Sequence, residues 1–291
     1  MLTRSFIAAL ILLGASAAGA AAEESHHTLW KVTGKHNAVY LFGSIHLLKA
    51  EDSSIPAAAL KDYGSAARVV MELDPTAMAL EALQNINLEM ETLPAGQTLP
   101  QVLGPALNKQ YQTHASELGI EAGMVEHFQP WFAAMMLEQV ELAQMGLDPE
   151  LGIDMQIAQM AKSDSKPIVG LETVAEQLGF FAHMSMQQQR EYLRSSLKEA
   201  DTLDTQLVEV VSAWKRGDAV ALEKQLVEGS RDTPEFSRLI GPERNRKWLP
   251  RIVEYLNGND NTMVVVGAMH LIGKDGLVEL LRAKGYSVEQ Q

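Results

Sequence analysis

A short pattern, Gly-x-x-His, occurs near each end of the chain and is its strongest chemical signal. The first copy is Gly43-Ser44-Ile45-His46 and the second is Gly267-Ala268-Met269-His270. Each copy follows an apolar run, which predicts a buried strand that ends at a turn. Glycine permits backbone conformations that other residues resist, so each histidine is expected to project from a strand end rather than into the core. Two imidazoles presented alike predict one site built from both ends of the fold.

Two glutamates follow predicted strands in a similar way. Glu72 comes directly after Val69-Val70-Met71, and Glu172 comes directly after the run 168–171. A carboxylate that closes a buried strand is costly unless it is paired, bound to a metal or open to solvent. Ligands of open α/β sheets bind outside the carboxyl ends of the strands, so these side chains are expected to meet there. The four residues form a ligand set for a divalent ion such as zinc, manganese or cobalt, namely His46, Glu72, Glu172 and His270.

Each of these residues also has a structural interpretation. A single histidine is more often a hydrogen-bonded polar residue than a ligand, and a glutamate at the start of a helix is favoured by the helix dipole. The matching surroundings of His46 and His270 favour the shared site, because the structural interpretation needs two similar coincidences.

A compact polar cluster, Glu243-Arg244-Asn245-Arg246, stands beside Trp248. It is either a solvated helix face or a place where Arg244 holds a carboxylate or a substrate carbonyl through paired hydrogen bonds. We therefore predict Glu72, Arg244 and Asn245 as catalytic residues. A carboxylate that is not bound to metal would act as general base, and Arg244 or Asn245 would stabilise the oxyanion. Asp154 falls inside a predicted helix, where it either reaches the site or is a surface acid, and the surface position is the one we expect.

Composition and missing motifs exclude several classes of function. The 291 residues carry 24 Lys and Arg against 37 Asp and Glu, which argues against nucleic acid or anionic lipid as a partner. Cysteine is absent, so thiol nucleophiles, cysteine zinc sites and iron–sulfur clusters are excluded. The sequence also lacks His-Glu-x-x-His, Gly-x-Ser-x-Gly, a phosphate-binding Gly-Lys-Ser/Thr loop and Gly-x-Gly-x-x-Gly. The standard zincin, serine hydrolase, nucleotide triphosphatase and dinucleotide-binding interpretations therefore lose support.

The first 22 residues have the pattern of a cleavable signal peptide. Arg4 precedes the apolar stretch 6–13, and small residues run up to Ala22. An uncleaved membrane anchor is the alternative. No later apolar run approaches the roughly 18 residues that a membrane span needs. We expect a soluble chain of residues 23–291, periplasmic or secreted, that forms one domain and does not insert into a membrane; its oligomeric state is left open.

The elements that must position these residues follow from periodicity and turn signals. Strands are predicted at 28–33, 38–42, 68–73, 167–171, 262–266 and 286–289. Helical periodicity predominates between them, above all over 94–163 and 185–229. A helix over 244–256 is expected to be broken or kinked at Pro250. The fold class is α/β, with a mixed β-sheet core built from both termini and a large helical middle region, roughly 94–240.

With these features the chain resembles the TraB/GumN family, which is related to the Tiki proteins. The resemblance covers nearly the whole mature chain and is carried by the segments 29–32, 40–46, 70–74, 146–154, 167–173, 243–248 and 265–288. It implies an α/β core like that of the erythromycin esterases and the haem-binding ChaN-type proteins. Tiki relatives are metal-dependent proteases that trim secreted signalling proteins, and TraB and PrgY relatives restrain peptide pheromones. The resemblance implies that the family's proposed metal or catalytic residues correspond to His46, Glu72 and His270 in this chain. It implies the same, on weaker matches, for Glu172, Arg244 and Asn245.

Three classes of function remain open. The first is an exported metal-dependent hydrolase, a peptidase above all, that acts on a peptide or protein; in a metal-free version a histidine would act as the base on an ester, as in the esterase relatives. The second is an envelope protein without enzymatic activity that binds a peptide or a haem-like ligand in the same cleft. The third is a structural or assembly role in the envelope.

Overall fold

The computed structural model describes residues 26–75 and 88–291. The signal peptide predicted at 1–22 lies outside the described residues. A helix is also predicted from Asp74 to about Glu91. Residues 76–87 of that segment lie outside the described residues, and α3, Leu88–Glu91, follows them.

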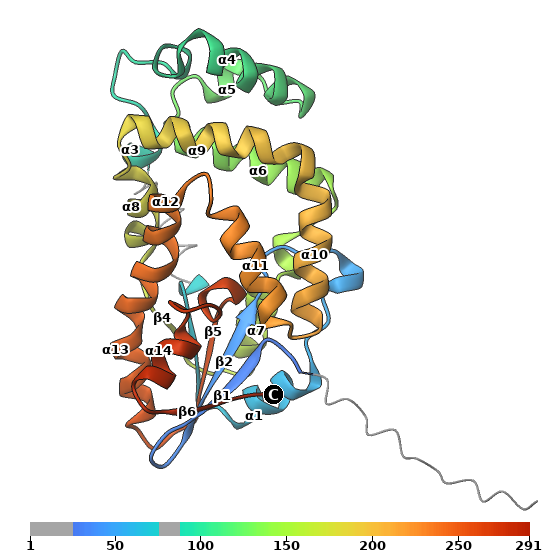
Figure 1. The fold of residues 1–291 in the computed structure, drawn as a ribbon, viewed down its shortest axis with the longest axis vertical. Helices are drawn as coiled ribbons and strands as arrows, with labels where there is room; N and C mark the ends of the chain where they lie inside the picture. Colours follow the sequence, from blue (N-terminus) through green and yellow to red (C-terminus); the bar gives the residue numbers. More distant parts are fainter. Residues whose placement is uncertain (1–25, 76–87) are drawn as a thin grey trace, which may run out of the picture.

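One mixed sheet forms the lower part of the molecule in Figure 1, and its strand order is β4-β3-β5-β2-β1-β6. Its strands are β1 (Leu29–Thr33), β2 (Ala38–Ser44), β3 (Arg68–Met71), β4 (Ile168–Gly170), β5 (Thr262–Gly267) and β6 (Ser287–Gln290). Strand β1 is antiparallel to β2 and β6, whereas β2, β5, β3 and β4 run parallel. The late strand β5 lies between the early strands β2 and β3. The carboxyl ends of four strands from distant parts of the chain therefore meet at one edge.

Burial explains why these segments form the centre of the sheet. All seven residues of β2 are buried, as are the first five of β5. A strand that is covered on both faces reads as an unbroken apolar run, which is the pattern that predicted both strands. The main core consists of these strands and the helices packed around them: α1 (Ala57–Ser65), α7 (Ile153–Ser163), α10 (Leu203–Lys215), α11 (Ala219–Gly229), α13 (Arg244–Leu256) and α14 (Leu277–Ala283).

The helical middle region extends away from the sheet in tiers (Figure 1). Helices α6 (Pro130–Gln144) and α9 (Met186–Glu199) pack side by side, and α4 (Leu99–Glu117) with α5 (Ala122–Val125) lies beyond them at the far end. These helices bury a second apolar core of their own. The connections back toward the sheet include α8 (Val174–Ala182) and α12 (Pro234–Arg238). The predicted α/β class, with a sheet from both termini and a helical middle, is confirmed.

Of the two alternatives at Pro250, the break is wrong, because α13 continues as one helix from Arg244 to Leu256; the kink stays a prediction. Trp248, Ile252 and Leu256 recur at four-residue spacing and are all buried in the main core. This packing offsets the hydrogen bond that a proline removes from a helix interior. Within the described ranges, no helix is long and apolar enough to cross a membrane.

Candidate active site

The carboxyl edge of the sheet brings the predicted residues together. His46 follows β2, Glu72 follows β3 directly, and Glu172 lies two residues after β4. His270 ends the short 3₁₀ turn Ala268–His270, which follows β5. The Nε2 atoms of His46 and His270 lie 3.9 and 3.8 Å from the same oxygen, Oε1 of Glu72. The two Gly-x-x-His motifs thus face one carboxylate.

The two motif glycines make this approach possible, because each leaves room for the other motif. A Cβ at Gly43 would lie 2.9 Å from the Cα of Ala268, and a Cβ at Gly267 would lie 3.3 Å from both His46 Nε2 and Glu72 Oε1. The carbonyl of Gly43 also accepts a 2.7 Å hydrogen bond from the indole of Trp214 on α10. The helical region therefore helps to fix the loop that carries His46.

Glu72 is the buried centre of the arrangement. Its Oε1 accepts a 2.7 Å hydrogen bond from the amide of Gly267, and its Oε2 lies 2.5 Å from Nη2 of Arg244. Burial acts to raise the pKa of Glu72, but His270, Arg244, His46 and the Gly267 amide outweigh it and lower the pKa to about 2. The carboxylate is consequently ionised throughout the neutral range.

Arg244, the first residue of α13, joins the two predicted carboxylates. Its Nη2 lies 2.5 Å from Oε1 of Glu172 as well as 2.5 Å from Glu72, and its Nε donates to both oxygens of Glu172. Glu172 also accepts hydrogen bonds from the indole of Trp248 and the amide of Gln177. The guanidinium is buried and stacks over the Trp248 ring, with 4.6 Å to the centroid. Arg244 therefore fixes both acids in a planar, charge-assisted network.

Asn245 fixes the ring of His270. Its amide nitrogen donates to the carbonyls of His270 and Asp275, so its Oδ1 faces Nδ1 of His270 at 2.7 Å and accepts a hydrogen bond from it. Nε2 of His270 is then the unprotonated nitrogen and accepts from Arg244 at 3.1 Å. Burial, with the charges of Arg244 and His46, lowers the pKa of His270 to about 4 against the attraction of Glu72. The ring is neutral at pH 7, so the positive charges that face Glu72 at this pH are those of Arg244 and His46. Asn245 is 2% exposed and all its hydrogen-bonding atoms are occupied, so it orients His270 instead of facing a substrate oxyanion.

His46 is the exposed member of the site. About half of its side chain is open to solvent, while Glu72 and His270 are buried. Its Nδ1 lies 3.0 Å from Oδ2 of Asp154 on α7. Burial opposes the charged form, but the hydrogen bond and charge of Asp154, together with Glu72, raise the pKa of His46 to about 9. The ring therefore carries a proton at neutral pH, with Nε2 directed at Glu72.

Asp154 contacts the site, although the sequence interpretation favoured a surface position for it. The start of α7 lies directly on the His46 loop: Ile153 N donates to Ile45 O at 3.0 Å, and a Cβ at Gly152 would lie 2.2 Å from His46 O. The signal was present as Gly152-Ile153-Asp154, in which a glycine at a helix start permits close backbone contact and the acid follows two residues later.

The predicted set of four metal ligands does not fit this arrangement. Arg244 contacts Glu72, Glu172 and Nε2 of His270, so a guanidinium occupies the position between the expected ligands. The oxygens of Glu172 are taken by Arg244, Trp248 and Gln177. Among residues 26–75 and 88–291, no group of three or more His, Asp or Glu side chains has a geometry that could hold a metal ion.

Comparison with curated proteins gives relatives of similar length but without an assigned activity. The chain is 24% identical over 243 residues to the uncharacterized protein YbaP of Escherichia coli K12, which covers 84% of this chain and 87% of YbaP. The YbaP protein of Shigella flexneri matches to the same extent. No solved structure shows significant similarity.

A family model matches nearly the whole of the described chain. The match runs over residues 28–290 and therefore includes both Gly-x-x-His motifs, Glu72, Asp154 and Arg244. The chain belongs to the TraB/PrgY/gumN family.

Proposed function

We propose that the protein is an exported hydrolase, periplasmic or secreted, that cleaves amide or ester bonds and acts on peptides or proteins. The observation that carries this proposal is the convergence of His46, Glu72 and His270, with one exposed imidazole above an ionised buried carboxylate. Such pairs of titratable groups with opposite pKa shifts are typical of acid–base catalysis.

The distances suit a reaction with water as the nucleophile. The 3.9 Å between His46 Nε2 and Glu72 Oε1 is too long for a direct hydrogen bond and short enough for both to hold one water molecule. In this mechanism Glu72 accepts a proton from the water as its oxygen attacks the carbonyl carbon. His46 then donates its proton to the leaving amine or alkoxide, so that one water is consumed and an acid and an amine or alcohol are released. The proton that Glu72 accepted passes to His46, which restores the carboxylate and the imidazolium for the next cycle.

The remaining residues act on these two groups. Asp154 orients the His46 ring through Nδ1, in the way that a carboxylate orients the histidine of a catalytic triad. Arg244 holds Glu72 ionised and in place, and Asn245 keeps the unprotonated Nε2 of His270 directed into the site. No step is assigned to a metal ion, because three of the four expected ligands, Glu72, Glu172 and His270, are engaged with Arg244.

The test is cleavage of a diverse peptide library, supplemented with simple esters, by the chain without its leader. We expect cleavage that His46→Ala and Glu72→Gln reduce by about 10²- to 10⁴-fold, the usual contribution of an acid–base group. The matched control is His36→Ala, which removes an exposed histidine of the β1–β2 turn.

Two further arms separate the alternatives. Activity that survives a chelator supports the metal-free mechanism. Activity that requires added manganese refutes it, because Arg244 would then not be the cation that occupies the position between the carboxylates. Unaltered peptides and esters in every condition, with retained peptide binding by the folded chain, would refute the hydrolase and favour the non-enzymatic binder.

A further inference from the structure

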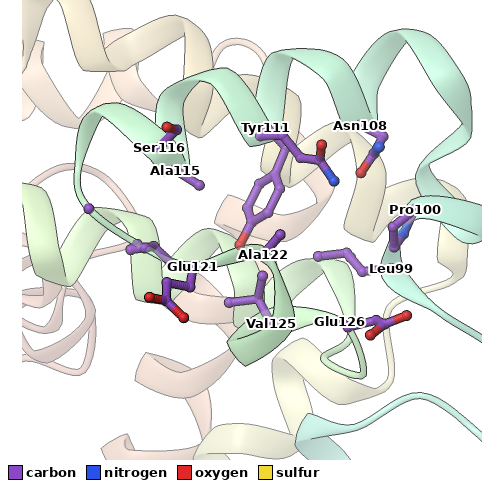
Figure 2. Close-up of a pocket in the computed structure, with 13 residues that line it drawn as sticks. Leu99, Pro100, Asn108, Tyr111, Ala115, Ser116, Glu121, Ala122, Val125 and Glu126 are labelled. Carbon is purple, nitrogen blue, oxygen red and sulfur yellow. The ribbon is translucent and has the colours of Figure 1, made fainter.

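The hollow drawn in Figure 2 lies in the helical tier, between α4 and α5, and its volume is about 440 Å³. In that view Tyr111 points from α4 toward Ala122 of α5. The described lining is confined to residues 99–126, and Figure 1 places α4 and α5 at the end of the molecule opposite the sheet. This hollow is therefore remote from the candidate active site, in contrast to a second one.

The second hollow, which we call the α10 hollow, lies beside the loop that carries His46. Its volume is about 390 Å³, within the range of about 300–1,000 Å³ that is usual for small-molecule sites. Residues between 48 and 52 of the His46 loop form one wall, and Met145 with Leu147, at the end of α6, forms another. The third wall is a face of α10 that includes Val208.

The first two walls lead directly to the exposed imidazole. Lys49 of the first wall follows His46 by three residues, so their Cα atoms are at most about 11 Å apart. The second wall continues into Asp148, which forms a β-bridge with Leu48. The same segment then begins α7, whose Asp154 contacts the His46 ring.

The third wall is tied to the same loop at two points. Trp214 of α10 donates its indole hydrogen bond to the carbonyl of Gly43, three residues before His46. Lys215, the next residue of α10, pairs with Asp52 on the far side of His46. All three walls of the α10 hollow are therefore held against the loop that presents His46, and the hollow lies within about three residues of that side chain.

The α10 face of the hollow is apolar and open to solvent. Leu207 and Val211 are half-buried, and Val208 is 68% exposed. An apolar group that covers such a surface removes it from water, which is favourable, and a hollow supplies contacts on several sides.

The charged side chains of the lining have both signs: Lys49, Glu51, Asp52, Asp204 and Lys215. Since Lys215 is paired with Asp52, the remaining charges are one lysine and two acids, and they nearly cancel. Apolar character, more than a charge of either sign, is therefore what this hollow selects.

We infer that the α10 hollow is a subsite of the proposed hydrolase and binds a bulky apolar side chain of the substrate, such as that of leucine or phenylalanine, two or three residues from the scissile bond. The inference rests on the proposed function, because this spacing is counted from a bond held at His46. An extended peptide covers the distance from His46 to Lys49 in about three residues. Val208 is the specificity-determining residue, because it is the most exposed apolar residue of the lining.

Profiling of matched peptides with the chain without its leader tests the inference. The peptides carry leucine, alanine or lysine at the second or third residue from the scissile bond, on either side. At one of these positions we expect kcat/KM to be about tenfold higher for leucine than for alanine. Val208→Glu should remove this preference through KM, because a subsite of this kind binds the ground state and the transition state alike.

The same substitution provides a gain of function. Val208→Glu places a carboxylate at the hollow, so it should raise kcat/KM for the peptide with lysine at that position above the wild-type value. The matched control is Val227→Glu, the same change at an exposed valine of α11 outside the lining, and it should behave like wild type. Equal cleavage of the leucine and alanine peptides by wild type, or an unchanged preference in Val208→Glu, would overturn the inference.

A binding measurement separates failure of this inference from failure of the proposed function. The probe is N-acetylleucinamide, the matched probe is N-acetylalaninamide, and the signals are the methyl NMR resonances of Val208 and Val227. We expect saturable shifts at Val208 but not at Val227, with about tenfold weaker binding of the alanine probe. These shifts without cleavage of any peptide would refute the hydrolase and support the hollow as a site for apolar residues. Cleavage of peptides while the probe leaves Val208 unshifted would refute the subsite and leave the hydrolase standing.

Discussion

Replacement of Arg244 by methionine tests the network on which the site depends. The side chain is 8% exposed, and its nitrogens contact Glu72, Glu172, His270 and the carbonyl of Ile240. Methionine keeps much of the volume but leaves two buried carboxylates without their cation. Removing one partner of a buried ion pair costs about 3–5 kcal/mol, which is a lowering of the melting temperature by about 10 °C for a domain of this size.

The pH dependence of this loss has a defined sign. In wild type the pKa of Glu72 is lowered to about 2 in the folded state, so its stabilising contribution is present above the unfolded value of 4.5 and is lost as the pH falls toward 2. Without Arg244, a buried carboxylate has a raised pKa, and its destabilising effect disappears as it becomes protonated. The deficit of Arg244→Met should therefore be largest at pH 7. It should shrink first as the pH falls from the raised pKa of the variant's carboxylate to 4.5, and then further between pH 4.5 and 2, where wild type loses the contribution of Glu72.

Urea unfolding followed by circular dichroism at pH 7 and pH 4 measures both effects. Arg246→Met is the matched control, since Arg246 is exposed and its pair with Asp275 should contribute about 1 kcal/mol or less. Adding Glu172→Gln to Arg244→Met should restore part of the stability by removing one unpaired charge. The reasoning is refuted if Arg244→Met unfolds within about 1 kcal/mol of wild type, a loss no larger than that expected of an exposed pair, or if its deficit is the same at both pH values.

Three further predictions concern the positioning of the motifs. Gly43→Ala should destabilise the fold by about 1–3 kcal/mol in a thermal melting assay, because the new methyl group meets the backbone of Ala268. The control is Gly64→Ala on α1, where a Cβ has open space, and it should be neutral or stabilising in the same assay. Trp214→Phe keeps an aromatic ring but loses the hydrogen bond to Gly43, and unfolding experiments should show a loss of about 1 kcal/mol; an unchanged stability would contradict the role given to that bond. Asp154→Asn should lower the pKa of His46 from about 9, measured by NMR titration of the imidazole signals, and a pKa that stays near 9 would show that Asp154 is not the cause.

Much of the fold could be predicted because local patterns and burial agree. The apolar runs of β2 and β5 are buried on both faces. A capping box, Thr173 with Glu176 three residues later, can be read from the sequence and begins α8 in the structure. The four strand ends carry His46, Glu72, Glu172 and His270 as predicted, since the strand positions follow from the same runs.

The partners of these residues could not be predicted, because they depend on tertiary packing. Asp154 meets His46 only because α7 begins on the His46 loop. Gly152 signals a close backbone contact at this helix start, but the local sequence does not say which loop makes the contact. Glu172 follows its strand in the same manner as Glu72, yet α13 brings Arg244 and Trp248 onto its oxygens. Likewise, the insertion of β5 between β2 and β3 is a property of the whole sheet.

In the proposed mechanism the two Gly-x-x-His motifs form a single reaction centre around Glu72. A double-mutant cycle on the best substrate from the library tests this arrangement, with kcat/KM measured for His46→Ala, His270→Ala and the double variant. Substitutions of residues that act as one unit have strongly non-additive effects on kcat/KM. The double variant should therefore have nearly the same kcat/KM as the less active of the two single variants. If instead the two losses multiply, or His270→Ala keeps full activity, the motifs do not form one centre.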